Sequence, residues 1–317
     1  EMSPSFALLL QRIEWSLYIA EGGPVALFNL VVLFLIAFDR KLRSQSELLF
    51  IGGLCAADLI DALAYFVSGI VRIRNVAQGT DLADQPQLAC FYTPFVIFFF
   101  YGYQLPAVMI TVVSVDRFCA VFLPSFHSRV TARTKLLVML GSFLWVTVFF
   151  AVSAYFQHIH ATALISPHCF AADSFLSTVW AIIIGQRIVF ITACVVIYIP
   201  IFVKTRTILN RTTESGKQQH RFNVTIGLTV ITALLLLVIP DTVVFFNILG
   251  LAEYHTFFYV ISLNKCVVNV FVYTLRQKEL KKLLLQQLRR CLHLKIKPTP
   301  SSKPNTLVAS TVQTQRS

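Results

Sequence analysis

Four ionisable side chains stand inside long apolar stretches of this sequence: Asp58, Asp61, Asp241 and Lys265. An unpaired charge at the centre of a hydrocarbon layer costs about 2.5 to 3.5 kcal/mol. Four such charges would together cost roughly 10 kcal/mol, which is comparable with the stability of a whole domain. We therefore expect each group to face the protein interior and either to pair or to lose its charge.

The spacing of these residues limits the chemistry that they can support. Asp58 and Asp61 are three residues apart, and Lys265 precedes Asn269 by four, so each pair shares one face of a helix. The ammonium of Lys265 can pair with either carboxylate, and the sequence leaves both partners open. A buried lysine can also form a Schiff base with a carbonyl compound such as retinal. Alternatively, these charges line a path for an ion or a solute.

Membrane-spanning helices must hold these residues in place. The 317 residues are 56% hydrophobic and 13% charged, with a mean hydropathy of +0.71, whereas about a quarter of the residues in soluble domains are charged. One crossing needs about 20 apolar residues, so we predict an all-α membrane protein with a seven-transmembrane bundle over residues 15–275. The predicted segments are 15–38, 48–71, 91–115, 136–156, 175–203, 223–249 and 256–275. Residues 21–24, Glu-Gly-Gly-Pro, are expected to interrupt the first segment.

Catalysis is not expected of this chain. The sequence contains no metal-ligand spacing, no nucleophile beside a base and no phosphate-binding loop, so neither an enzyme nor a bound cofactor is predicted. A soluble enzyme is also excluded by the composition.

Positive charge is unequally divided between the two sides of the predicted bundle. Most Lys and Arg residues follow the first, third, fifth or seventh segment, and Arg12, Arg72 and Arg74 fall on the opposite side. Because basic residues are enriched on the cytoplasmic side, we expect residues 1–14 to be extracellular and the C-terminus cytoplasmic, in a multi-pass plasma-membrane protein. The net charge of +12 then matches anionic membrane lipids, and no nucleic-acid partner is expected.

Short motifs occur in a characteristic order along the seven segments. Asp116-Arg117-Phe118 closes the third segment, and Asn269-Val-Phe-Val-Tyr273 closes the seventh. Single markers in the other segments are Asn29, Asp58, Trp145, Pro200 and Pro240. This set resembles the rhodopsin-like (class A) G-protein-coupled receptors. Within that class, the stretches around Cys90, Gln104 and Val115 to Pro124 are similar to the nematode serpentine chemoreceptors of the SX class.

The resemblance implies a receptor that binds an extracellular small molecule or peptide and activates a heterotrimeric G protein, with arrestin as a further partner. It assigns G-protein coupling to Asp116, Arg117 and Tyr273. It assigns an activation core to Asn29, Asp58, Lys265 and Asn269. It assigns a ligand pocket to Phe99, Phe100, Tyr103, Gln104, Arg187, Asp241 and Phe245, and a disulfide to Cys90 and Cys169. A seven-helix ligand-gated channel or transporter is the alternative.

Lys265 gives this resemblance two further implications. In the family, the positions of Asp58 and Asn269 border a sodium pocket, so the lysine either replaces the ion with a tethered ammonium or only links two helices. Visual opsins carry their retinal lysine six residues before the motif asparagine, whereas Lys265 is four before Asn269. Two residues turn a helix by about 200°, so Lys265 should point away from a retinal pocket.

Four positions depart from the family pattern. Val270 stands where helix 7 carries proline, and Val238 stands where many members carry a switching tryptophan. Ile208 lies eight residues after Pro200, where a tyrosine often holds the active state, and His220 replaces the acid that often pairs with the family arginine.

Residues 276–294 combine leucines at helical spacing with Lys and Arg on the opposite face, which predicts an amphipathic helix on the inner membrane surface. Cys291 near its end is a candidate for palmitoylation. Residues 295–317 are rich in Pro, Ser and Thr, and we predict a disordered cytoplasmic tail.

Overall fold

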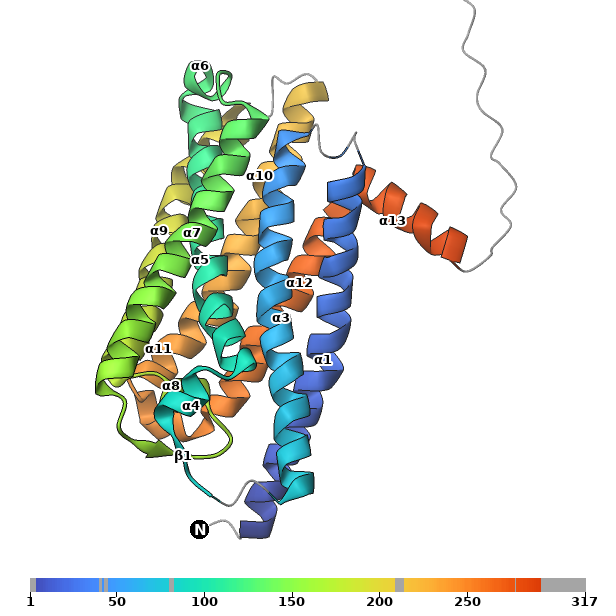
Figure 1. The fold of residues 1–317 in the computed structure, drawn as a ribbon. Helices are drawn as coiled ribbons and strands as arrows, with labels where there is room; N and C mark the ends of the chain where they lie inside the picture. Colours follow the sequence, from blue (N-terminus) through green and yellow to red (C-terminus); the bar gives the residue numbers. More distant parts are fainter. Residues whose placement is uncertain are drawn as a thin grey trace, which may run out of the picture.

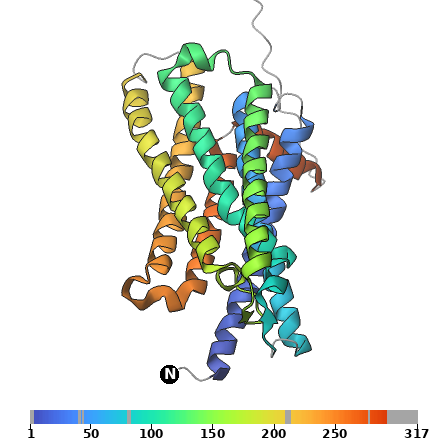
Figure 2. The same cartoon turned by 60° about the vertical axis from the view of Figure 1, so that its left-hand side comes forward.

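Long helices run alternately up and down a single bundle in this computed structural model (Figures 1 and 2). The structure describes residues 4–39, 42, 45–79, 83–208, 214–276 and 278–291. The long helices are α1 (Pro4–Phe38), α3 (Ser46–Gln78), α5 (Pro94–Phe122), α7 (Ala132–His160), α9 (Ser177–Ile208), α10 (Glu214–Ala233) and α12 (His255–Arg276). The π-helical segment η2 (Leu234–Val238) and the helix α11 (Ile239–Phe245) continue α10.

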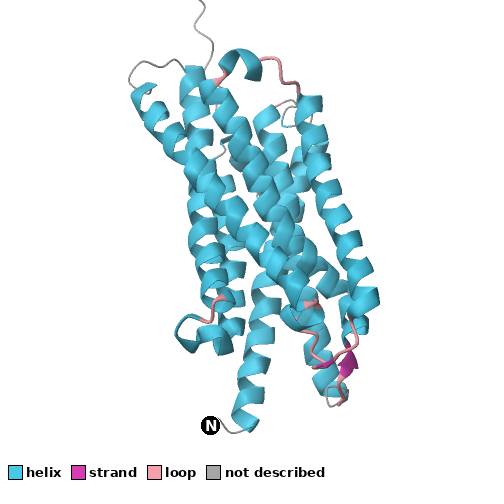
Figure 3. Cartoon of the chain, turned by 90° about the vertical axis from the view of Figure 1, so that its left-hand side faces the viewer, coloured by secondary structure: helices cyan, strands magenta, loops and turns pink. Residues whose placement is uncertain are grey.

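Short elements close the two ends of the bundle. At the end that holds the N-terminus, β1 (Gln85–Pro86) pairs antiparallel with β2 (Leu164–Ile165), next to α4 (Gln87–Phe91) and α8 (Ala171–Ser174) (Figures 1 and 3). A disulfide joins Cys90 to Cys169 here, and we call this the disulfide end. The 3-10 segment η3 (Ile248–Tyr254) precedes α12. The short helix α6 (Pro124–His127) lies at the opposite end, called the Arg117 end.

Seven helices within the described residues are long and apolar enough to cross a membrane, as the sequence predicted. The candidate spans are Leu9–Phe38, Glu47–Gln78, Pro94–Phe122, Ala132–His160, Ser177–Thr205, Asn223–Phe245 and Phe257–Thr274. Several helices extend beyond the predicted segments; α1 already begins at Pro4, and α3 continues to Gln78. Hydropathy marks where the apolar run ends, but backbone hydrogen bonds continue until a residue such as Gly79 adopts a left-handed conformation (φ 66°).

Residues 21–24 interrupt the apolar run of the first segment, but they do not break the helix, and α1 runs through them. The glycines instead allow close packing between α1 and α3. A Cβ at Gly22 would lie 2.9 Å from the carbonyl oxygen of Ala62, and one at Gly69 would lie 2.7 Å from that of Trp15. Small residues at such crossings let two helix backbones approach, which is how membrane helices gain packing energy.

We therefore expect Gly69→Ala to destabilise the protein by about 1 to 3 kcal/mol, since a methyl group there meets a backbone atom that cannot move aside. Gly141→Ala on α7 is the matched control, because a Cβ at this position has no heavy atom within 4 Å. The control should leave stability unchanged or raise it by up to about 1 kcal/mol. Thermal unfolding of both purified variants measures the difference; equal unfolding temperatures would contradict the close packing.

The core of the bundle lies around α5, whose side chains are buried along most of its length. By contrast, α7 and α9 expose continuous apolar faces that include Leu137, Leu144 and Val189. Trp145, the marker residue of α7, is also exposed. An apolar outer surface is stable in a lipid bilayer, so this pattern fits a membrane-embedded bundle.

The helix predicted after the seventh span is present as α13 (Lys278–Cys291), which turns away from the bundle axis at the Arg117 end (Figure 1). Leu280 is buried, and Leu283 and Leu284 pack against the core. The side chain of Cys291 and all of residues 292–317, including the predicted tail, lie outside the described residues.

Candidate functional site

Arg117 is buried in an ion-pair cluster at the Arg117 end. Its side chain is 1% exposed and pairs with the neighbouring carboxylate of Asp116. Nη1 of Arg117 also lies 3.4 Å from Oε1 of Glu47, at the start of α3. His220 stands where the family often carries the acid that holds this arginine, and here Glu47 supplies an acid from another helix. The side chain of His220 is outside the described residues.

Asp116 binds two further basic groups. Nζ of Lys135, from α7, lies 3.2 Å from Asp116 Oδ1, and Nε2 of His127, from α6, lies 3.3 Å from the same oxygen. Burial lowers the pKa of His127 below its usual 6.5, although Asp116 opposes the shift by favouring the protonated ring. The cluster therefore ties α3, α5, α6 and α7 together in a closed arrangement.

Tyr198 on α9 is a buried residue that the sequence analysis did not single out. Its ring lies against α10, since a Cβ added at Gly227 would be 3.5 Å from it. The side chain of Ile208 lies outside the described residues. The position of Ile208 was counted from Pro200. The inward face of α9 is marked instead by Arg187 and Tyr198, which are both buried. They are 11 residues apart, or about three helical turns, so they lie on the same face.

Asp58, Lys265 and Asn269 meet at the centre of the bundle. The ammonium of Lys265 pairs with Asp58 Oδ1, and Nδ2 of Asn269 donates to Asp58 Oδ2 at 2.9 Å. All three side chains are buried. The structure thus selects Asp58 from the two partners that the sequence left open.

Asp61 and Asn29 have different partners. Sγ of Cys266 donates to Asp61 Oδ2 at 3.5 Å, and a Cβ at Gly102 would lie 2.6 Å from Asp61 Oδ1, so the glycine makes room for this carboxylate. Nδ2 of Asn29 donates to the carbonyl of Val25 in its own helix at 3.0 Å. Three of the four residues assigned to the activation core are therefore in contact. Asn29 is also buried, but its amide nitrogen bonds to its own helix and not to Asp58.

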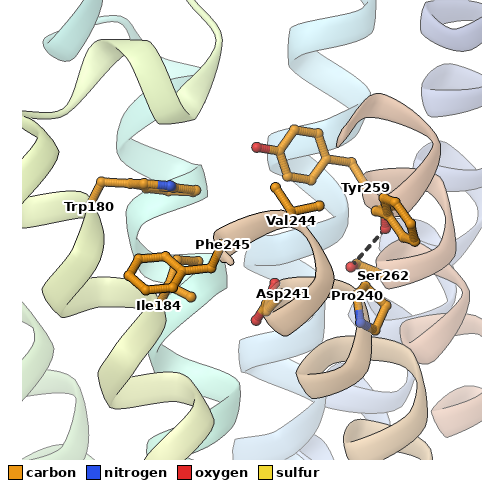
Figure 4. Close-up of a pocket in the computed structure, with 9 residues that line it drawn as sticks. Trp180, Ile184, Pro240, Asp241, Val244, Phe245, Tyr259 and Ser262 are labelled. Atoms are coloured by element: carbon orange, nitrogen blue, oxygen red, sulfur yellow. Dashed lines mark hydrogen bonds between the residues drawn. The ribbon is translucent and has the colours of Figure 1, made fainter. Parts of the chain in front are cut away.

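A narrow cleft lies between α9, α11 and α12, with space of about 20 Å³ for water-sized molecules (Figure 4). Its lining comprises Trp180, Ile184, Pro240, Asp241, Val244, Phe245, Phe258, Tyr259 and Ser262. Asp241 and Phe245 are two of the predicted pocket residues. The rest of the lining is mostly apolar and aromatic.

Arg187 lies beside this cleft and binds Asp241 through both carboxylate oxygens, via Nε and Nη2. Its guanidinium also stacks over the ring of Tyr103, 4.3 Å from the centroid. Tyr103 in turn contacts Trp180 edge to face, with centroids 5.2 Å apart. Phe99 joins the same aromatic group through Tyr103. Five of the seven predicted pocket residues thus gather at or next to the cleft.

The other two lie elsewhere. Phe100 packs against Phe149, Phe150 and Phe175, on the side of α5 that faces α7. Nε2 of Gln104 donates to the carbonyl of Ile183 on α9 at 3.2 Å. Consecutive residues of a helix are about 100° apart, and on α5 this turn directs Phe99 toward Tyr103 and Phe100 toward α7.

Arg72 has a structural role that the sequence did not reveal. In the sequence it was only one of the few basic residues on the side of the bundle opposite to most Lys and Arg residues. Nε of Arg72 donates to the carbonyl of His168 at 2.8 Å, and Nη2 donates to that of Cys169 at 3.3 Å. Its guanidinium also covers the ring of Phe170 at 4.7 Å. Arg72 and the disulfide together hold the loop before α9 over the disulfide end.

The disulfide between Cys90 and Cys169 should be found in the purified protein by peptide mapping without reductant. Replacing both residues with serine should lower the free energy of unfolding by about 2 to 4 kcal/mol, because the unfolded chain gains freedom. Cys119→Ser is the control, since Cys119 is a free thiol on α5. Alkylation of both Cys90 and Cys169 in the folded protein would contradict the bond.

The sequence profile of one protein family, the serpentine type seven-transmembrane G-protein-coupled chemoreceptors Srsx, matches residues 25–288. No individual curated protein matches the chain. The matched region contains the seven spans after the first part of α1, the Asp116-Arg117 motif and both disulfide cysteines. This family consists of receptors rather than enzymes. With most of the chain covered, the protein belongs to the serpentine seven-transmembrane G-protein-coupled chemoreceptor family Srsx.

Proposed function

We propose that this chain binds an extracellular small molecule or peptide at the disulfide end and activates a heterotrimeric G protein at the Arg117 end. The observation that carries the proposal is the Arg117 cluster, in which one buried arginine is held by acids and its neighbours tie together four elements. A two-state bundle needs such a contact, which one state keeps and the other breaks.

The distribution of charge supports an orientation. Basic residues gather at the Arg117 end, including Lys135 and the Lys and Arg residues of α13. By the positive-inside rule, this end faces the cytoplasm of the plasma membrane and the N-terminal end of α1 is extracellular. The G protein, and arrestin as a further partner, would then meet Asp116, Arg117 and Tyr273 when the bundle opens.

The centre of the bundle connects the two ends. The ammonium of Lys265 on Asp58 takes the position that the resemblance assigns to a sodium ion, and we propose that it acts as a tethered substitute for that ion. Asn269 shares the same carboxylate, so a shift of α12 alters both contacts together.

The segment η2 offers a place for movement. Its π-helical turns end at Val238, where the resemblance expects a tryptophan, and Pro240 follows two residues later. Proline removes a backbone hydrogen bond, and π-helical turns are common at functional sites. We propose that α11 moves relative to α10 at this segment.

The amphipathic α13 supports a position on the inner membrane surface. Its leucines face the bundle at Leu280 and pack at Leu283 and Leu284, while its lysines and arginines suit anionic lipid head groups. A palmitoyl group on Cys291 would strengthen that attachment.

The channel or transporter alternative has less support. A conducting path would need its charged residues to face water, whereas Asp58 and Lys265 are buried and bind each other. The test is to express the chain in cells with and without functional G proteins and to apply panels of volatile compounds and peptides. Calcium or cyclic AMP responses that require the G protein support the receptor; ligand-gated current in cells without G-protein signalling would contradict it.

A further inference from the structure

The ion pair beside the cleft leaves one partner with unused hydrogen-bonding capacity. A guanidinium has five N–H donors. Nε and Nη2 of Arg187 each donate to Asp241, and within the part of the chain that the structure describes Nη1 donates to no acceptor. The side chain of Arg187 as a whole is 3% exposed. Its remaining N–H groups can donate to a ligand that accepts hydrogen bonds.

The cleft itself favours a molecule that is mostly apolar. Trp180, Ile184 and Phe245 form one wall (Figure 4). Ser262 opposite already donates its hydroxyl to the carbonyl of Phe258 at 3.0 Å. The charged group in the lining is Asp241, with Arg187 directly behind it. A ligand here therefore needs an apolar body and one polar head group.

Arg187 and Asp241 differ in the cost of being left without a partner when a ligand separates them. If an amine took Asp241, Arg187 would be left without its partner in its buried position over Tyr103. If an anion took Arg187, the released Asp241 could take up a proton and lose its charge, whereas a guanidinium keeps its charge at ordinary pH. Leaving a charge buried and unpaired is the more costly result, so exchange by an anion is favoured.

We propose that the cleft binds a monocarboxylate with an apolar body, whose carboxylate bonds to Arg187 in competition with Asp241. The inference rests on the proposed function, because it takes the cleft as the ligand pocket of the receptor. A carboxylate matches the planar donor geometry of a guanidinium better than other anions of this size, since two parallel hydrogen bonds can form.

The exchange also gives binding a route to the rest of the bundle. Arg187 is on α9 and Asp241 is on α11, directly after Pro240 and η2. Replacing an interhelical ion pair with a contact between ligand and α9 releases α11 from α9. The ligand then favours the state in which the two helices are apart, as a conformational change driven by differential binding requires.

The test uses the purified full chain with three probes of equal chain length: sodium octanoate, octylamine and octan-1-ol. Thermal unfolding is measured as a function of probe concentration, since a ligand that binds the folded state raises the unfolding temperature. We expect octanoate to raise it in a saturable manner and the other two probes to have little effect. Equal stabilisation by octanol, stabilisation by octylamine alone, or no effect of octanoate would each overturn the proposal.

Variants of the ion pair should change octanoate binding in opposite directions, which a general effect on folding would not do. Asp241→Asn removes the competitor while leaving Arg187 in place, so octanoate should bind about tenfold more tightly. The double variant Arg187→Gln with Asp241→Asn keeps two uncharged groups that can hydrogen-bond, and it should lose the response to octanoate. Arg74→Gln, an exposed site at the same end of α3, removes the same charge and should behave like the unmodified chain. Weaker octanoate binding in Asp241→Asn would overturn the proposal.

Binding and signalling are measured separately so that the two proposals fail separately. Octanoate binding that follows this pattern without any G-protein response would support the carboxylate site and contradict the receptor function. A G-protein response to other compounds, with no octanoate binding, would support the receptor function and overturn the carboxylate site.

Discussion

Arg117→Ala is expected to reduce G-protein activation to the level of cells without the receptor, while ligand binding at the disulfide end persists. The side chain is buried between Asp116 and Glu47, so it becomes available to a partner only when α3 and α5 separate at this end. The fold should tolerate the change, because Asp116 keeps Lys135 and His127, and Glu47 is 24% exposed to solvent.

This prediction is checked by a G-protein activation assay at matched surface expression, together with thermal unfolding of the purified variant. Arg133→Ala is the control, since Arg133 is exposed on α7 at the same end and carries the same charge. Full signalling by Arg117→Ala would remove this residue from the coupling site. Loss of signalling in the control as well would show a general effect of charge.

Lys265→Met is expected to destabilise the protein by about 3 to 5 kcal/mol, because Asp58 would remain buried with only the amide of Asn269 as a recorded partner. Adding Asp58→Asn removes the stranded carboxylate and should restore part of the loss. A double-mutant cycle on unfolding temperature and surface expression measures this coupling directly. Asp61→Asn is the matched comparison, because Asp61 contacts Cys266 rather than Lys265 in a recorded hydrogen bond.

The same residue gives an expectation for sodium. If the ammonium occupies the place of the ion, agonist affinity should not depend on sodium when potassium replaces it at constant ionic strength. Additive effects of Lys265→Met and Asp58→Asn, or a strong decrease of agonist affinity by sodium, would contradict the role of Lys265 as a tethered substitute. In Lys265→Met with Asp58 intact, a new dependence on sodium is expected, since the free carboxylate can then bind the ion.

The sequence by itself determined the membrane class, the number of spans and the family. These properties depend on runs of about 20 apolar residues and on motifs within a single helix, such as Asp116-Arg117, which need no knowledge of neighbours. The lysine in the seventh span was also identified as needing a buried partner, since the cost of an unpaired charge does not depend on which residue neutralises it.

Only the tertiary structure decided which residues meet. Asp58 rather than Asp61 binds Lys265, Glu47 approaches Arg117 from a distant part of the chain, and Arg72 holds the loop of the disulfide. The rotation of α9 buried Tyr198 against α10, next to Gly227. The physical reason is that a helix can rotate about its axis without changing its hydropathy when it is apolar on all sides, as α9 is. Its inward face is set by packing and ion pairs with other helices, such as Arg187 with Asp241, and these contacts exist only in the assembled bundle.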